Sequence, residues 1–117
     1  MKNLSLNERL ENVAVIGAAG KMGRGISLVM LQVMIRHQLE TKAQQSAQLI
    51  LVDNKISNLQ SLKDYLQQQM LKFAEKNINT IRDWYKQEAK LIDNQQIIDQ
   101  FLSDSLKLIH PTTNLQD

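Results

Sequence analysis

The sequence contains no cysteine, which excludes disulfide cross-links, thiolate metal sites and cysteine nucleophiles. Aromatic residues are scarce, at 4% of the total, and they are not interleaved with basic residues as in single-strand nucleic-acid binders. Net charge is also small: the 117 residues carry a formal charge of +2, too weak a bias to indicate a nucleic-acid partner. We therefore expect no nucleic acid among the partners of this chain.

Long hydrophobic runs are missing as well. No apolar run approaches the roughly 20 residues that a membrane-spanning helix needs. The first ten residues are polar and lack the apolar core of a signal peptide. These observations predict a cytoplasmic protein without membrane contact. Glycine is rare too, and its four residues all stand between positions 17 and 25.

A short apolar strand, a glycine turn and a helix follow one another in this region. The strand, about Asn12 to Ile16, is uncharged and mostly β-branched, a composition typical of a strand buried on both faces. Gly17, Gly20 and Gly23 come next, and the helix is predicted over about Lys21 to Glu40. This order is the one that a dinucleotide-binding βα unit requires. The helix has one apolar stripe of the kind that faces a core, made of Met22, Ile26, Val29, Met30, Val33 and Met34.

The residues of the turn suit a pyrophosphate. A helix that begins just after a strand directs its free N–H groups, and the positive end of its dipole, at whatever lies above the turn. Gly17 and Gly20 would supply the tight turn and the open backbone, and Gly23 would let the helix pack closely. Alternatively, the glycines only punctuate a turn. The predicted cofactor-binding residues here are Gly17, Ala18, Ala19, Gly20, Lys21, Met22 and Gly23, with Lys21 facing solvent and adding positive charge.

A second apolar strand, about Gln48 to Asp53, ends in an acid. In dinucleotide folds a carboxylate at this strand tip binds the ribose hydroxyls of the adenosine, and its charge would repel a 2′-phosphate. Asp53 therefore favours NAD over NADP. It follows Gly23 by thirty residues, where about 20 is usual, which we attribute to a long first helix. Alternatively, Asp53 or its neighbour Asn54 only caps the next helix.

The rest of the chain is mainly helical. A helix from Asn54 has Ile56, Leu59, Leu62, Leu66, Met70 and Phe73 on one face, and residues 77–80 are predicted to interrupt the pattern. A third helix is expected around Ile81 to Leu91, with Trp84 in the core. Asp93 and Gln96 are positioned to cap a fourth helix. A third strand is predicted at about 106–110.

No catalytic residue can be assigned. The histidines, His37 and His110, lie far apart in sequence, and neither has a spaced metal partner or an evident acid. We expect His37 on a helix surface and His110 at a strand end. The sequence thus predicts a place to bind a cofactor, without a metal site and without the residues for its chemistry.

Three segments resemble the 3-hydroxyacyl-CoA dehydrogenases: Val15 to Ile26, Leu51 to Asp53 and Leu106 to Leu115. The resemblance covers nearly the whole chain and corresponds to the first part of the N-terminal NAD-binding domain of that family. It implies NAD-linked oxidation of 3-hydroxyacyl-CoA, a step of fatty-acid metabolism. It also implies a projecting pair of helices near the CoA, which would place Lys72 and Lys76 as acyl-CoA substrate contacts.

Two departures from the family pattern matter. The glycines here read Gly-x-x-Gly-x-x-Gly rather than Gly-x-Gly-x-x-Gly, and this spelling is similar to dihydrodipicolinate reductase, an alternative NAD(P) domain. The family's catalytic His–Glu pair and dimerisation domain follow the fourth strand, and neither His37 nor His110 matches that histidine. We therefore expect a truncated domain that is inactive alone. The rival hypotheses are a non-catalytic nucleotide-binding or assembly module and a helical interaction module.

The expected fold is α/β: a Rossmann-type β-α-β-α-α-β half with parallel strands in the order 3-2-1, right-handed crossovers and an incomplete sheet. The first strand would then lie at an edge, with a row of unpaired N–H and C=O groups. Such an edge predicts a homodimer formed through it, or a swapped element.

Overall fold

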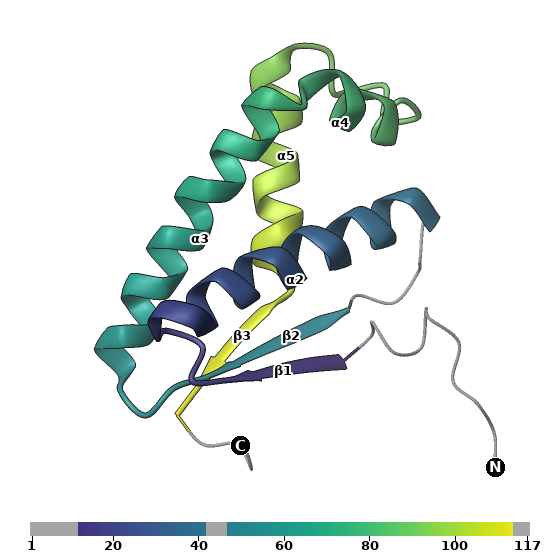
Figure 1. The fold of residues 1–117 in the computed structure, drawn as a ribbon. Coiled ribbons are helices and arrows are strands. Elements are labelled where there is room, and N and C mark those ends of the chain that lie inside the picture. Colours follow the sequence, from purple (N-terminus) through teal and green to yellow (C-terminus); the bar gives the residue numbers. More distant parts are fainter. Residues whose placement is uncertain (1–11, 42–46, 114–117) are drawn as a thin grey trace, which may run out of the picture.

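The computed structural model describes residues 12–41 and 47–113, which form an α/β unit with a three-stranded parallel sheet (Figure 1). The strands are β1 (Asn12–Ile16), β2 (Gln48–Val52) and β3 (Ile109–Thr112), in the order β1-β2-β3. Leu51 stands opposite Val15 of β1 on one side and opposite Pro111 of β3 on the other. The helices are α2 (Lys21–Thr41), α3 (Ile56–Lys76), α4 (Ile78–Trp84) and α5 (Asn94–Leu106).

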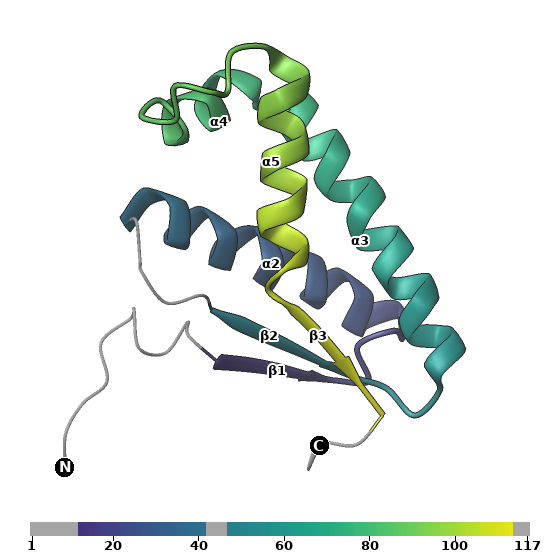
Figure 2. The same ribbon diagram turned by 180° about the vertical axis from the view of Figure 1, so that it is seen from behind.

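The described helices lie on one side of the sheet (Figures 1 and 2). In β1, Val15 is buried beneath them, whereas Ala14 and Ile16 point to the opposite side and are exposed, Ile16 by 65%. The sequence predicted a strand buried on both faces, and within the described part of the chain this is wrong. A run without polar alternation shows that both faces can be buried, but another layer has to cover the second face.

Helices α3 and α5 rise from the sheet side by side and carry α4 at their far end (Figure 2). Their contact is built around Phe101, which is fully buried and stacks with Phe73 at 5.9 Å and with Trp84 at 6.3 Å between ring centroids. Trp84 is half-buried and packs against the core, in partial agreement with the prediction. Most of the remaining buried side chains are aliphatic, and among the most deeply buried are Leu31, Leu49, Leu62, Leu66, Met70, Ile97 and Leu108.

The face that α2 buries differs from the stripe predicted for it. The buried residues are Ser27, Leu31, Met34 and Ile35, and of the predicted stripe only Met34 is among them. Met30 is half-buried against the core, and the remaining stripe residues lie on the outer side, where Met22 is 81% exposed and Val29 57%. Helix α2 has apolar residues on two adjacent faces, so periodicity alone indicates both without saying which one meets the sheet.

The observed bounds of the later helices and of β3 differ in part from the predicted ones. Helix α4 begins at Ile78 rather than near residue 81, because Asn77 alone separates it from α3. Asp93 caps α5 together with Gln96, as predicted. Helix α5 continues to Leu106, so β3 begins at Ile109, three residues after the predicted start. None of the described helices combines the length and the apolarity needed to cross a bilayer.

Candidate functional site

The glycine turn connects β1 to α2 at the carboxyl edge of the sheet (Figure 1). Gly17 has a φ of +67°, a left-handed conformation that favours glycine, and its carbonyl accepts a hydrogen bond from the N–H of Gly20 at 3.0 Å. Helix α2 begins at Lys21, as predicted, and the Arg24 N–H bonds the Gly20 carbonyl at 2.7 Å. The N–H groups of the first turn of α2 therefore stand directly after the turn.

Gly23 is where a side chain is least tolerable. A Cβ built there would lie 2.0 Å from the carbonyl oxygen of Gly17 and 3.0 Å from the Cα of Ala18. At Gly20 the corresponding Cβ would lie 3.3 Å from the same oxygen, which is tight but not prohibitive. Gly23 thus allows the first turn of α2 to pack against the backbone of the turn, close to the role predicted for it.

Asp53 directly follows β2 and lies beside the glycine turn. Its Oδ2 accepts a hydrogen bond from the backbone N–H of Ala19 at 3.2 Å, while the Ala18 N–H bonds the Val52 carbonyl at 2.9 Å. The structure therefore brings together the two features that the sequence analysis predicted to bind one dinucleotide. The alternative role, in which Asp53 or Asn54 is the N-cap of the next helix, does not hold: the N-cap of α3 is Lys55, without a side-chain cap.

The carboxylate of Asp53 is held in its charged form. Its Oδ1 accepts from the side-chain amide of Asn58 at 3.2 Å and from the Lys55 N–H at 3.3 Å. The Asn58 bond is the largest cause of the shift and lowers the pKa of Asp53 below its ordinary value; burial, the next largest, opposes it, and the backbone bonds lower the pKa further. A carboxylate has about four acceptor positions, and the N–H groups of Ala19 and Asn54 bond Asp53 as well, so a ribose hydroxyl would replace one of these donors.

Asn58 was missed by the sequence analysis. It lies in the first turn of α3, five residues after Asp53, and a polar residue there gives no signal beyond an ordinary exposed helix position. The basic residues near the turn are Lys21, which is exposed as predicted, and Arg24, whose guanidinium lies 4.8 Å above the ring of Tyr65 in α3. That contact fixes Arg24 between two helices and adds positive charge near the turn.

A groove of about 460 Å³ opens between the first turns of α3 and the carboxyl end of β3. Its volume is in the range of small-molecule sites. The lining is mostly apolar, with Lys63 as a charged residue at its wall. Apart from Lys63, it is made of Ile56, Leu59, Gln60, Pro111, Thr112 and Thr113.

Other predicted residues lie away from this site. Lys72 and Lys76 are exposed in the last two turns of α3, and a helix of 21 residues is about 30 Å long, so they stand far from Asp53. His37 is half-buried on α2, whereas His110 is exposed on β3. Within residues 12–41 and 47–113 no cluster of acidic and histidine side chains is suited to holding a metal ion.

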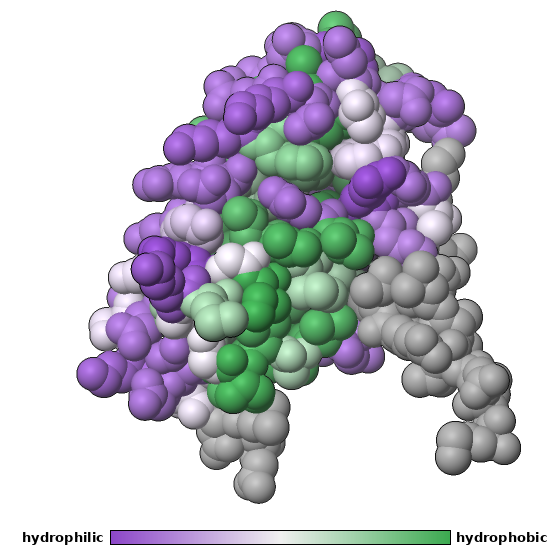
Figure 3. Space-filling view, in the orientation of Figure 1, coloured by the Kyte–Doolittle hydropathy of each residue, from purple (hydrophilic) through white to green (hydrophobic). Residues whose placement is uncertain are grey.

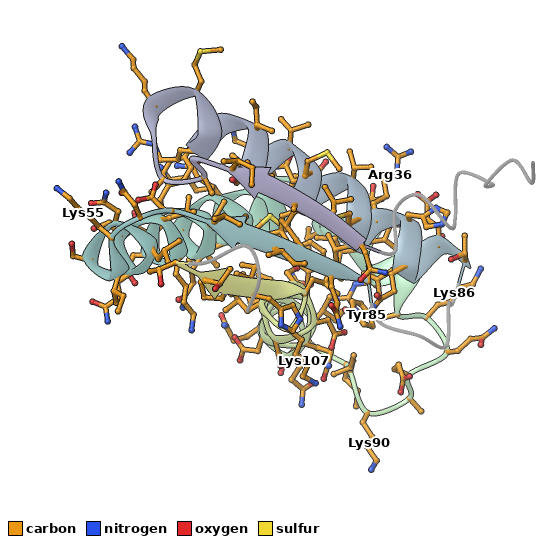
Figure 4. The ribbon with its side chains drawn as sticks, turned by 90° about the horizontal axis from the view of Figure 1, so that it is seen from below. Arg36, Lys55, Tyr85, Lys86, Lys90 and Lys107 are labelled. Carbon is orange, nitrogen blue, oxygen red and sulfur yellow. The ribbon has the colours of Figure 1, made fainter. Side chains whose placement is uncertain are left out.

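A separate polar contact joins Tyr85 to α5. The Tyr85 hydroxyl donates to Oδ2 of Asp104 at 2.6 Å, and burial, followed by this bond, raises the pKa of Tyr85 far above its ordinary value. Tyr85 therefore stays protonated at neutral pH. Seen from below the sheet, it lies at the end of the molecule opposite Lys55, and so far from the glycine turn (Figure 4). The contact holds the segment after α4 against α5.

No protein-family model, no curated protein and no solved structure matches this chain.

Proposed function

We propose that this chain is the adenosine-binding part of a Rossmann-type NAD-binding domain. The observation that carries the proposal is the hydrogen bond from the Ala19 N–H to Asp53, because it joins the turn at the start of α2 to the acid at the tip of β2. The residues from Gly17 to Gly23 would hold the pyrophosphate, and Asp53 the ribose hydroxyls. The strand order, which reads β3-β2-β1 from the other edge, supports a Rossmann-type half sheet.

The chemistry proposed for the whole enzyme is that of a 3-hydroxyacyl-CoA dehydrogenase. When bound, NAD would accept the hydride from the 3-hydroxyl carbon of the substrate. This part of the proposal is supported by the resemblance of the three sequence segments and by the projecting pair α3 and α5 between β2 and β3. Lys72 and Lys76, near the far end of that pair, are then candidates to contact the CoA.

A second candidate function is a non-catalytic nucleotide-binding module. It is favoured by one observation: neither of the ion pairs found among the described residues, Arg36 with Glu40 and Lys86 with Asp83, involves a histidine. Both candidates require the same binding site and differ only in whether residues elsewhere supply a proton acceptor. The first experiment therefore tests binding.

Calorimetric titration with NAD, NADP and ADP-ribose tests the site, with Asp53→Ala and the matched control Asp64→Ala, an exposed acid on α3. We expect NAD and ADP-ribose to bind, NADP to bind more weakly, and Asp53→Ala to lose about tenfold or more in affinity, the usual effect of a hydrogen bond to a charged group. Asp64→Ala should bind like the parent chain. Absence of binding by all three nucleotides, or equal losses in both variants, would contradict the proposal.

A further inference from the structure

The outer face of α2 carries exposed apolar side chains beside the edge of β1, and Ile16 of β1 is exposed on the opposite face of the sheet. Figure 3 shows the hydrophobic residues gathered over α2 and extending downward toward the sheet. The exposed fractions are 65% for Ile16, 81% for Met22 and between 42% and 57% for the others: Ile26, Val29 and Val33. Part of this surface is a groove of about 510 Å³ on α2. It lies between Met22 and Val29, where Gly25 has no side chain to fill the space. Apolar surfaces of this kind mark interaction sites.

The edge of β1 beside this surface has unpaired backbone groups. Leu49 bonds the Leu108 carbonyl of β3, so the alternate residue Ile50 faces β1. Given the register of Ile50 with Ala14, its bonds go to Val13 and Val15, and the N–H and C=O of Ala14 point away from the sheet. The same alternation turns Asn12 and Ile16 outward. Within the described part of the chain, β1 pairs with β2 alone.

The two edges of the sheet are not equivalent. At the β3 edge, Pro111 faces outward and has no N–H to donate, which blocks strand addition. The β1 edge has no such protection, because no proline, lysine or other charged residue occurs from Asn12 to Gly20. Strand addition is therefore favoured at β1.

We propose that a second copy of this chain covers the surface made by the β1 edge and the outer face of α2. A two-fold axis perpendicular to the sheet at Ala14 pairs β1 with its copy in antiparallel orientation. Ala14 then stands opposite Ala14 of the copy, and Asn12 opposite Ile16, each pair exchanging two N–H···O bonds. The same axis keeps both α2 helices on one face of the joined sheet, so that their outer faces, apolar beside Lys21, approach each other.

The size of the surface agrees with a homodimer. Full burial of a large apolar side chain removes roughly 60–120 Å² from water, so the four exposed side chains of α2 supply about 240 Å² per copy and about 480 Å² in the pair. Because about 65% of a homodimer interface is apolar, the whole contact is on the order of 700 Å², the size of a weak interface. We expect a dimer that dissociates on dilution.

Light scattering over a concentration series tests the proposal on the parent chain and on the variant Val29→Lys. The control is Leu71→Lys, which places the same charge on α3, where Leu71 is 37% exposed. The parent chain and Leu71→Lys should dimerise, whereas Val29→Lys should raise the dissociation constant at least tenfold. A parent chain that stays monomeric at millimolar concentration would overturn the proposal, and so would a dimer that Val29→Lys leaves unchanged.

A cross-link tests the position of the axis. The Cα atoms of a hydrogen-bonded antiparallel pair lie about 5.5 Å apart, within the range that a disulfide bridges. The chain has no cysteine of its own, and Ala14 is exposed, so Ala14→Cys should form a covalent dimer under mild oxidation. Leu71→Cys is the control and should stay monomeric on a reducing-agent-free gel. Equal cross-linking of the two variants would contradict pairing through β1.

Discussion

Gly23 and Gly25, both in the first turns of α2, differ sharply in the space available for a side chain. A Cβ at Gly23 would lie 2.0 Å from the Gly17 carbonyl oxygen, whereas a Cβ at Gly25 meets nothing within 4 Å. Gly23→Ala should therefore destabilise the chain by about 3 kcal/mol, because backbone rather than a side chain has to move. Gly25→Ala should stabilise it by about 0.5–1 kcal/mol, because alanine has the higher helix propensity.

Urea unfolding at one low protein concentration measures both variants, and each serves as the control for the other. Equal effects of the two substitutions would contradict the packing of α2 on the turn.

The sequence could predict that Gly23 permits close packing, because its spacing from the strand fixes where the helix begins. It could not predict that Asn58 would bond Asp53 or that Arg24 would stack on Tyr65, because both contacts depend on how α3 lies beside the turn.

At the scale of elements, local signals predicted where helices begin better than which face they bury. Helix α2 begins at the predicted Lys21, and the cap of α5 is the predicted Asp93, because both signals lie within a few residues of the helix start. The buried face of α2 depends instead on the position of the sheet. Predicted stripe residues such as Met22 and Val29 consequently lie on the outside. The start of β3 was also misplaced, because Leu106 fits a helix as well as a strand.

The N-cap of α5 should contribute to the stability of the fold. Asp93 accepts from the Gln96 N–H at 2.8 Å, and the Gln96 side chain accepts from the Asp93 N–H at 3.1 Å. Asp93→Ala should cost about 1 kcal/mol of stability, the usual value for losing an N-cap. The control is Asp99→Ala on the same helix, which loses an exposed bond from Gln95 and should change stability by less than about 0.5 kcal/mol. Thermal unfolding compares them, and equal losses would contradict a specific role for the cap.

For the whole molecule, alternating strand and helix patterns predicted an α/β unit with a parallel sheet, and this is confirmed. The placement of every described helix on one side of the sheet follows from how the crossovers turn, and it leaves Ala14 and Ile16 exposed on the other. The turn and Asp53 meet because the carboxyl ends of neighbouring parallel strands share one edge, which is why residues far apart in sequence could be assigned to one site.

Amide hydrogen exchange tests the free edge of β1, because it measures the protection of each backbone N–H group of the sheet. In the monomer the N–H groups of Val13 and Val15 bond β2, whereas those of Ala14 and Ile16 point to the open edge. Dilute protein should therefore exchange Ala14 and Ile16 quickly and Val13 and Val15 slowly. In concentrated protein, the proposed dimer should slow Ala14 and Ile16 by tenfold or more and leave Leu49 and Leu51, which already bond β3, almost unchanged. Protection of Ala14 that does not depend on concentration would instead indicate that the edge is covered within a single chain.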